Sequence, residues 1–128
     1  NALMSPMAMI LTDQDMEDLA AYFASQTLRQ TGETEPSKFE LGQRIFRAGI
    51  AARGVPSCAG CHGPAGRGIP GAAFPAIGGQ HAVYAALQLR NYRSATRATD
   101  PNTMMRTIAA KLTDEEIDAV ASYLQGMR

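Results

Sequence analysis

Two stretches of the chain, one near each end, place hydrophobic residues at intervals of three and four positions. This spacing marks one face of an amphipathic α-helix. The positions are Met16, Leu19, Ala20 and Phe23 in the first stretch and Ile117, Val120, Ala121 and Leu124 in the second. We therefore predict one helix near the start of the chain and another at residues 113–126, each with a buried face.

These two helices belong to a longer internal repeat. When residue 1 is set against residue 102, the two sequences correspond without a gap over about 27 positions. Both copies contain Leu-Thr-Asp, and the Thr is followed three places later by an acid: Thr12 by Asp15, and Thr113 by Glu116. A Thr and an acid at this spacing are typical of a capping box at the start of a helix.

A repeat of this length indicates an array of similar domains. We expect residues 1–27 to be the closing segment of a preceding domain, residues 28–37 to be a polar linker, and residues 38–128 to form a domain of their own. The apolar face of the first segment would then need a neighbouring surface, or a second molecule, to cover it. Self-association through residues 1–27 is therefore a further expectation.

Between the two copies, the pattern predicts three more helices. The first would start at a capping box of Ser37 and Glu40, run through residues 38–53, and end at Gly54 and Pro56. Its apolar face would comprise Leu41, Ile45, Ala48 and Ala52.

A loop rich in Gly and Pro follows over residues 62–79, and helical periodicity returns over residues 80–95. The third helix would be short, with Asp100 as its N-cap and Pro101 at its first position. No stretch alternates apolar and polar residues as a strand does. We predict an all-α fold.

Composition and charge narrow the classes of function. The chain has 128 residues with twelve basic and twelve acidic side chains, and this balance argues against general nucleic-acid binding. No apolar run approaches the ~20 residues of a membrane-spanning helix. The charges are nevertheless segregated: residues 41–113 contain nine bases and one acid, Asp100. This basic block is either a solvated face or a docking surface for an acidic partner.

The only two cysteines lie in Cys-Ala-Gly-Cys-His, residues 58–62. This spacing is the attachment motif of a c-type haem, in which Cys58 and Cys61 form thioethers and His62 is an axial ligand of the iron. Three alternatives are a zinc site, a redox-active dithiol and a structural disulfide. A zinc site needs four ligands, a dithiol of the thioredoxin type needs a strand-rich fold, and a disulfide across two residues would be strained.

The repeat also indicates the second axial ligand. Met104 corresponds to Leu3 and Met7 corresponds to Ile108, so an aliphatic side chain serves at those positions, but Met105 corresponds to Met4. A Met kept in both copies suggests a role for its sulfur. We predict that Met105 is the distal ligand of the iron and that Met4 served the haem of the absent preceding domain.

With these motifs together, the chain resembles the class I c-type cytochromes, and among them the dihaem cytochrome c4 family. The resemblance rests on GVPSCAGCHGPAGRG, FPAIGGQHAVY, QLRNYRSATRATDPNTMM and TIAAKLTDEEIDAVASYLQG, with LTDQDMEDLAAYFASQ matching the end of a first domain. It implies the class I cytochrome c fold, with helices packed around one covalent haem c here and two haems in the presumed full-length protein. It also implies that the Pro75 carbonyl accepts the second ring N–H of His62, and that Tyr92 and Arg97 lie near the haem edge and propionates.

The resemblance further implies a periplasmic electron carrier that is not an enzyme. Its partners would be quinol-cytochrome c reductase and a terminal oxidase or reductase, with loose membrane association only through those partners. One alternative is the cytochrome subunit of a flavocytochrome sulfide dehydrogenase. Others are a gas sensor or peroxidase-like haem enzyme, which would need an open sixth position on the iron, and a zinc-binding module. The chain departs from the family in having no second Cys-x-x-Cys-His motif.

Overall fold

The structure, a computed structural model, describes residues 3–27 and 32–127. Within these ranges the regular elements are all helical, and the only pairings of β type are two isolated bridges. The elements in chain order are α1 (Met4–Met9), α2 (Asp13–Ser25), α3 (Pro36–Ala48), the 3-10 turn η1 (Ala51–Arg53), α4 (Cys58–His62), η2 (Pro70–Ala72), α5 (Ala82–Arg93), η3 (Pro101–Thr103), α6 (Met104–Ala109) and α7 (Asp114–Gln125). The prediction of an all-α fold is confirmed.

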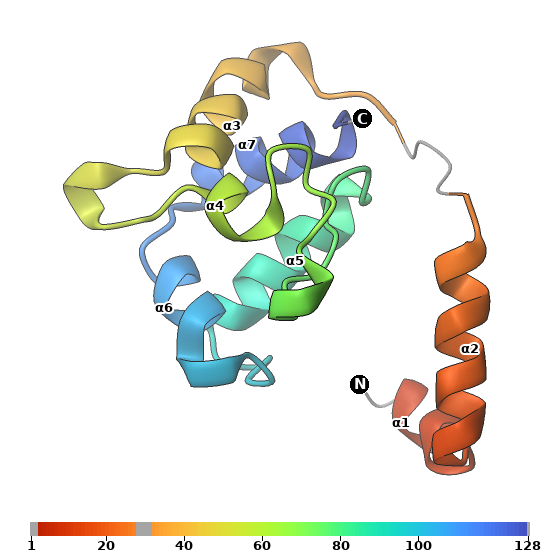
Figure 1. The fold of residues 1–128 in the computed structure, drawn as a ribbon. Helices are drawn as coiled ribbons and strands as arrows, with labels where there is room; N and C mark the ends of the chain where they lie inside the picture. The colour runs from red at the N-terminus through yellow and green to blue at the C-terminus, as the bar shows by residue number, and fades with distance from the viewer. Residues whose placement is uncertain (1–2, 28–31, 128) are drawn as a thin grey trace.

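We call the part of the chain that contains α3 to α7 the main domain. Helices α3, α5 and α7 form its core (Figure 1). α7 packs against both α3 and α5, while α6 packs against α5 and α4 packs against α3. The largest fully buried side chains are Phe46 and Ile45 on α3 and Ile117 on α7. Phe46 and Tyr123 place their ring centres 5.6 Å apart. The apolar face predicted for residues 113–126 is therefore the centre of the fold.

α3 differs from its prediction at both ends. It begins at Pro36, whose fixed φ suits the first turn, and Ser37 donates its hydroxyl to the Glu35 carboxylate, so the expected capping box of Ser37 and Glu40 is absent. The helix ends at Ala48 because Gly49 takes φ +71°, so the predicted extension through residue 53 is wrong. The buried face is Gly42, Ile45 and Phe46, while Ala48 and Ala52 are exposed.

Both capping boxes of the repeat are present. The Thr12 hydroxyl accepts the Asp15 N–H while the Asp15 carboxylate accepts the Thr12 N–H, and Thr113 and Glu116 form the same pair of bonds. In each case two otherwise unsatisfied N–H groups are bonded at the first turn. The capping boxes predicted at the N-termini of α2 and α7 are therefore confirmed.

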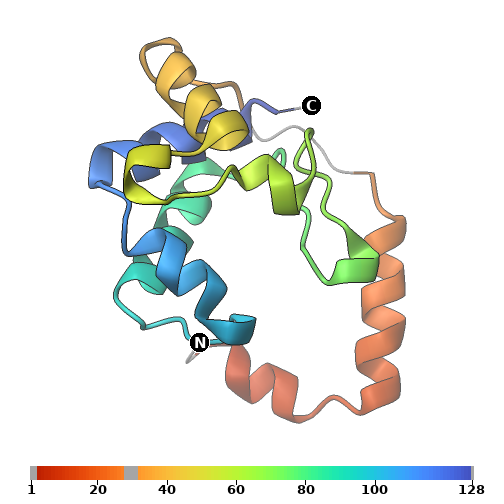
Figure 2. The same ribbon diagram turned by 60° about the vertical axis from the view of Figure 1, so that its left-hand side comes forward.

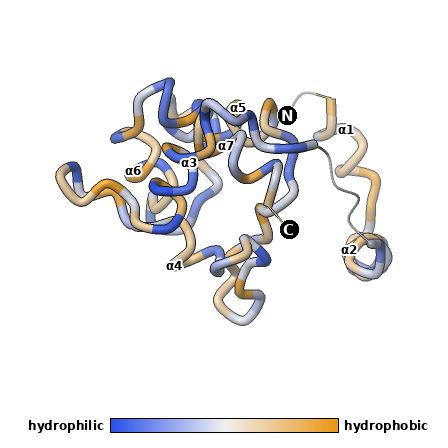
Figure 3. Tube along the Cα trace, turned by 90° about the horizontal axis from the view of Figure 1, so that it is seen from above, coloured by the Kyte–Doolittle hydropathy of each residue, from blue (hydrophilic) through white to orange (hydrophobic). Residues whose placement is uncertain are grey.

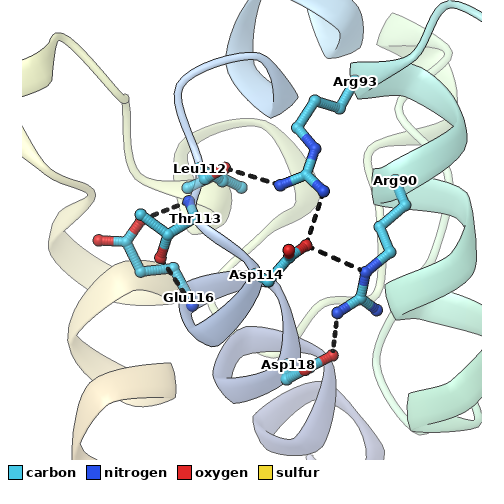
Figure 4. A network of polar contacts seen from close by, with 7 residues as sticks. All are labelled: Arg90, Arg93, Leu112, Thr113, Asp114, Glu116 and Asp118. Carbon is cyan, nitrogen blue, oxygen red and sulfur yellow. Dashed lines mark hydrogen bonds and ion pairs between the residues drawn. The ribbon is translucent and has the colours of Figure 1, made fainter.

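An ion-pair network joins α5 to the start of α7 (Figure 4). Asp114 accepts from Arg90 at 3.3 Å and from Arg93 at 2.6 Å, and Asp118 accepts from Arg90 at 2.8 Å. Arg53, also in the basic block, pairs with Glu116. Three of the nine bases in the block are thus paired with acids of α7.

Figure 1 shows α1 and α2 apart from helices α3 to α7, and in the turned view of Figure 2 α2 stays apart while α1 is drawn next to the start of α6. Neither helix has a buried residue, and the chain of α1 is coloured toward the hydrophobic end of the scale (Figure 3). Met16, Leu19 and Phe23 are 45%, 41% and 67% exposed. The face that the sequence marks as apolar is therefore uncovered in the chain by itself.

The predicted linker includes a stretch that is held in place. Residues 28–31 lie outside the described residues, but residues 33–35 contact the end of α7. The Glu35 N–H donates to Ser122 Oγ at 2.9 Å, and the Gln125 side chain donates to the Glu33 carbonyl at 3.2 Å. Residues 33 and 35, which the sequence assigns to the linker, are therefore hydrogen-bonded to α7.

Candidate haem site

The short helix α4 holds the two cysteines. The Ser57 hydroxyl caps it by accepting the Gly60 N–H at 3.1 Å, and Cys58 and Cys61, three residues apart, share one face. Both are free, half-buried thiols. Burial raises the pKa of the Cys58 thiol to about 11, so this sulfur is a neutral thiol at physiological pH. In the protein without a bound group, Cys58 therefore offers a thiol and not a thiolate.

His62, at the end of α4, is fixed by the loop that follows it. The imidazole is 8% exposed, and Nδ1 donates to the Pro75 carbonyl oxygen at 2.8 Å. A carbonyl can only accept, so the proton must be on Nδ1 and Nε2 keeps its lone pair. This is the tautomer that a metal-binding histidine requires, with the second ring nitrogen held by the protein.

Gly68 allows the loop to bring Pro75 to His62. It takes φ +77°, and a Cβ at this position would lie 2.5 Å from the Phe74 carbonyl oxygen and 2.7 Å from the Ala76 nitrogen. The Gly68 N–H also donates to the His62 carbonyl at 2.8 Å. The backbone on either side of Pro75 therefore lies in contact with Gly68, and a residue with a side chain does not fit at position 68. The sequence shows the Gly and Pro content of this loop but does not show which glycine makes the contact.

Met105 is the second residue of α6, in a segment with an unusual backbone. Asn102 and Thr103 both take left-handed conformations, with φ +51° and +56°, at a cost of about 1–3 kcal/mol each. Met105 is half-buried, whereas Met104 is exposed. Pro101 begins a 3-10 turn rather than the helix, and the Asp100 side chain makes no cap bond there. Asp100 thus occupies the expected N-cap position and Pro101 the expected first position, but of a 3-10 turn without a cap bond, and α6 begins only after the two left-handed residues.

Tyr92 and Arg97 lie together at the end of α5. The Arg97 guanidinium carbon is 4.7 Å from the centre of the Tyr92 ring, a distance typical of a cation–π contact. Arg97 also donates to the Gln88 side chain at 2.9 Å. The structure therefore brings these two predicted residues into contact with each other. His81 is exposed at the N-cap of α5 and makes no side-chain cap bond there.

The residues present fit a covalently attached haem. They supply two thiols on one face of a short helix, an imidazole with its Nε2 lone pair available, and a thioether on α6. Among the described residues there is no group of three or more His, Cys, Asp or Glu side chains that could hold a metal ion, which leaves the zinc alternative without a ligand set. Met4 is on α1, 59% exposed, and does not belong to this site.

Comparisons with known proteins agree with this chemistry. The family model described as cytochrome c matches residues 39–128. The chain is 49% identical over 118 residues to cytochrome c4 of Pseudomonas aeruginosa, covering 91% of this chain and 58% of that protein. It is 39% identical to a protein of Stutzerimonas stutzeri named thiosulfate dehydrogenase electron acceptor, covering 96% of this chain and 57% of that protein. The chain thus spans somewhat more than half the length of these relatives.

A solved structure gives the same result for the fold. The crystal structure of reduced recombinant cytochrome c4 from Pseudomonas stutzeri superposes with a TM-score of 0.94 at 44% identity. The match covers 98% of this chain and 66% of that one. It therefore includes the segment of α1 and α2 as well as the main domain.

Proposed function

The chain belongs to the cytochrome c family, and on that basis we propose that it carries single electrons through a haem c held by Cys58, Cys61, His62 and Met105. The observation that carries the proposal is the hydrogen bond from His62 Nδ1 to the Pro75 carbonyl. It fixes the imidazole plane and the tautomer, which leaves the Nε2 lone pair for a metal. A histidine with a merely structural role would not need its second nitrogen left available.

Each residue of the site has a separate task in this proposal. The haem, when bound, supplies an iron that changes oxidation state by one electron. Cys58 and Cys61 tether it at two points, and His62 donates its Nε2 lone pair. Met105 donates a thioether, which favours the ferrous state and raises the reduction potential. Tyr92 and Arg97 would lie at the haem edge, where the guanidinium can neutralise a carboxylate.

Two protein ligands on the iron favour electron transfer over catalysis at the metal. A substrate would have to displace Met105 to reach the metal. Carbon monoxide should therefore not bind the reduced protein at neutral pH. Binding would instead support a gas sensor or peroxidase-like enzyme.

The domain organisation and setting remain part of the proposal. Residues 1–27 would close a preceding haem domain, with Met4 as the axial ligand of its iron. This is supported by the match to cytochrome c4 from Pseudomonas stutzeri, which covers 98% of this chain but only 66% of that one. Within the described residues no helix is long and apolar enough to cross a membrane. We place the protein in the periplasm, between quinol-cytochrome c reductase and a terminal oxidase or reductase.

A second candidate is favoured by one comparison. The relative named thiosulfate dehydrogenase electron acceptor suggests a donor that oxidises a sulfur compound instead of a quinol-cytochrome c reductase. This is close to the alternative of a cytochrome subunit of a sulfide-oxidising flavoenzyme. The rate at which each purified donor reduces the protein distinguishes the two, and a co-purifying flavoprotein would identify the flavocytochrome.

The absorption spectrum of the pure protein, with haem counted per chain, tests the ligand set. We expect one haem for the single attachment motif and a weak sulfur-to-iron charge-transfer band in the oxidised form. Met105→Ala should abolish that band, and the matched variant Met104→Ala should keep it. A colourless protein, or loss of the band only in Met104→Ala, would contradict the proposal.

A further inference from the structure

Asp100 is a buried acid in a basic stretch of the chain, and both of its carboxylate oxygens are bonded to one residue. Its side chain is 2% exposed. Oδ2 accepts the backbone N–H of Arg106 at 3.0 Å, and Oδ1 accepts the guanidinium Nε–H at 2.7 Å. Burial raises the pKa of Asp100, but these hydrogen bonds outweigh burial and hold it below its usual range. The group is therefore a carboxylate at neutral pH.

This carboxylate closes a loop that contains both strained residues and Met105. The bonds from Asp100 to Arg106 span residues 101–105, which include the left-handed Asn102 and Thr103. Strained backbone persists only where surrounding contacts over-determine it. The pair of bonds from Asp100 is such a contact, because it ties the residue just before the segment to the residue just after it.

The same carboxylate replaces the missing cap of α6. The N-cap position of α6 is Thr103, whose side chain makes no cap hydrogen bond. The first N–H groups of a helix have no partner within the helix, and the N–H of Arg106, the third residue of α6, is one of them. Asp100 accepts it from outside the helix. The first turn of α6, which carries Met105, is therefore held by a residue that precedes the helix by four positions.

We propose that Asp100 is a positioning residue for the sixth iron ligand: by holding Arg106 through both carboxylate oxygens, it fixes the first turn of α6 and keeps the Met105 thioether on the iron. The inference rests on the proposed function, because it requires Met105 to be the ligand. The internal repeat places Ser5 at the position of Arg106. The guanidinium that bonds Asp100 is thus present in the C-terminal copy of the repeat and absent from the N-terminal copy.

Displacement of Met105 by imidazole, added to the oxidised holoprotein, tests the proposal. Imidazole can bind only when the thioether has left, so the concentration at which the charge-transfer band is half lost reports how firmly α6 holds Met105. Asp100→Asn removes the charge and keeps the size of the side chain. A charge-assisted hydrogen bond commonly changes an equilibrium by about tenfold or more. We expect half-loss at an imidazole concentration about tenfold lower than in the unsubstituted protein.

Asp114→Asn is the matched control, because it removes the same charge from an exposed carboxylate that bonds Arg90 and Arg93. It should lower global stability without changing the imidazole concentration at half-loss. Arg106→Lys is the second variant: it keeps the charge and the backbone bond but loses the Nε–H, and it should give an intermediate shift. This variant decides the question if Asp100→Asn does not fold.

The outcomes separate the two proposals. If Met105→Ala loses the charge-transfer band but Asp100→Asn and Arg106→Lys take up imidazole as the unsubstituted protein does, Met105 is the ligand and the positioning role of Asp100 is wrong. An equal shift in Asp114→Asn would also overturn it, since the effect would then be one of global stability. If the unsubstituted protein has no such band, the assignment of Met105 itself fails.

Discussion

The crossing of α3 and α7 at Gly42 gives a stability prediction that can be worked out from the structure. A Cβ at this position would lie 2.7 Å from Tyr123 Cβ and 2.9 Å from the Ala119 carbonyl carbon, and closer still to the Ala119 oxygen. Non-bonded carbon atoms pack at about 3.5–4.0 Å. Gly42→Ala therefore requires α7 to move outward by about 1 Å at this point.

The clash should outweigh the gain in helix propensity. Overpacking costs about 1–3 kcal/mol, and the upper end applies because the Ala119 carbonyl is backbone within a helix and cannot rotate away. Alanine in place of glycine within a helix returns about 1 kcal/mol. The net loss of about 2 kcal/mol in the free energy of unfolding lowers Tm by roughly 8–16 °C for a domain of this size.

Thermal unfolding of the holoprotein, followed by far-ultraviolet circular dichroism, measures this loss. Gly71→Ala is the matched control, since its added Cβ meets no atom within 4 Å. It should leave Tm unchanged or slightly raised. If Gly42→Ala melted at or above the temperature of the unsubstituted protein, the close approach of α3 and α7 would not be a constraint on the fold.

Three further predictions concern α7 and its neighbours. Ile117→Ala should lower the free energy of unfolding by about 2–5 kcal/mol in a denaturant titration, because this side chain is fully buried; a smaller loss would mean that the core collapses around the gap. Thr113→Ala should cost about 1 kcal/mol by removing the cap of α7, whereas Thr12→Ala, at the exposed α2, should leave unfolding of the main domain unchanged. Hydrogen bonds from Arg93 and Arg90 lower the pKa of Asp114, so its stabilising effect is full above the unfolded pKa near 4 and is lost as pH falls through the folded value. Unfolding midpoints measured against pH should therefore show a smaller decline toward acid in Asp114→Asn, and an unchanged decline would refute the role of this ion pair.

The elements that the sequence predicted correctly are those whose signals are local. The capping boxes at Thr12 and Thr113 and the apolar stripe of α7 depend on residues within one or two turns, and each is present in the structure. The attachment motif is equally local, because its three residues lie on a single short helix. The all-α fold class followed from helical periodicity and the absence of alternating stretches.

The features that could not be predicted from the sequence are those that depend on contacts beyond one or two helical turns. The end of α3 was placed too late because the periodicity of alanines continues past Gly49, where the chain turns into the bridge between Ile50 and Val55. The expected capping by Ser37 failed because Pro36 starts the helix earlier. The role of Gly68 depends on the backbone of a residue pair six to eight positions away, and no local pattern encodes that approach.

The basic block illustrates the same limit. Its nine bases against one acid invited the interpretation of a docking surface. The structure pairs Arg53, Arg90 and Arg93 with acids of α7, so a linear count overstates the charge available to a partner. Electrostatic steering then rests on fewer side chains, and the reduction rate by a partner should depend only weakly on added salt.

The docking of residues 33–35 onto the end of α7 has an architectural consequence. The chain enters the main domain beside the place where it leaves, since Gln125 bonds the Glu33 carbonyl and a Cβ on Gly126 would meet the Thr34 nitrogen at 2.6 Å. A module with adjoining entry and exit can be grafted into a surface loop of an unrelated host, or have its ends joined and be reopened elsewhere, with little distortion of its interior.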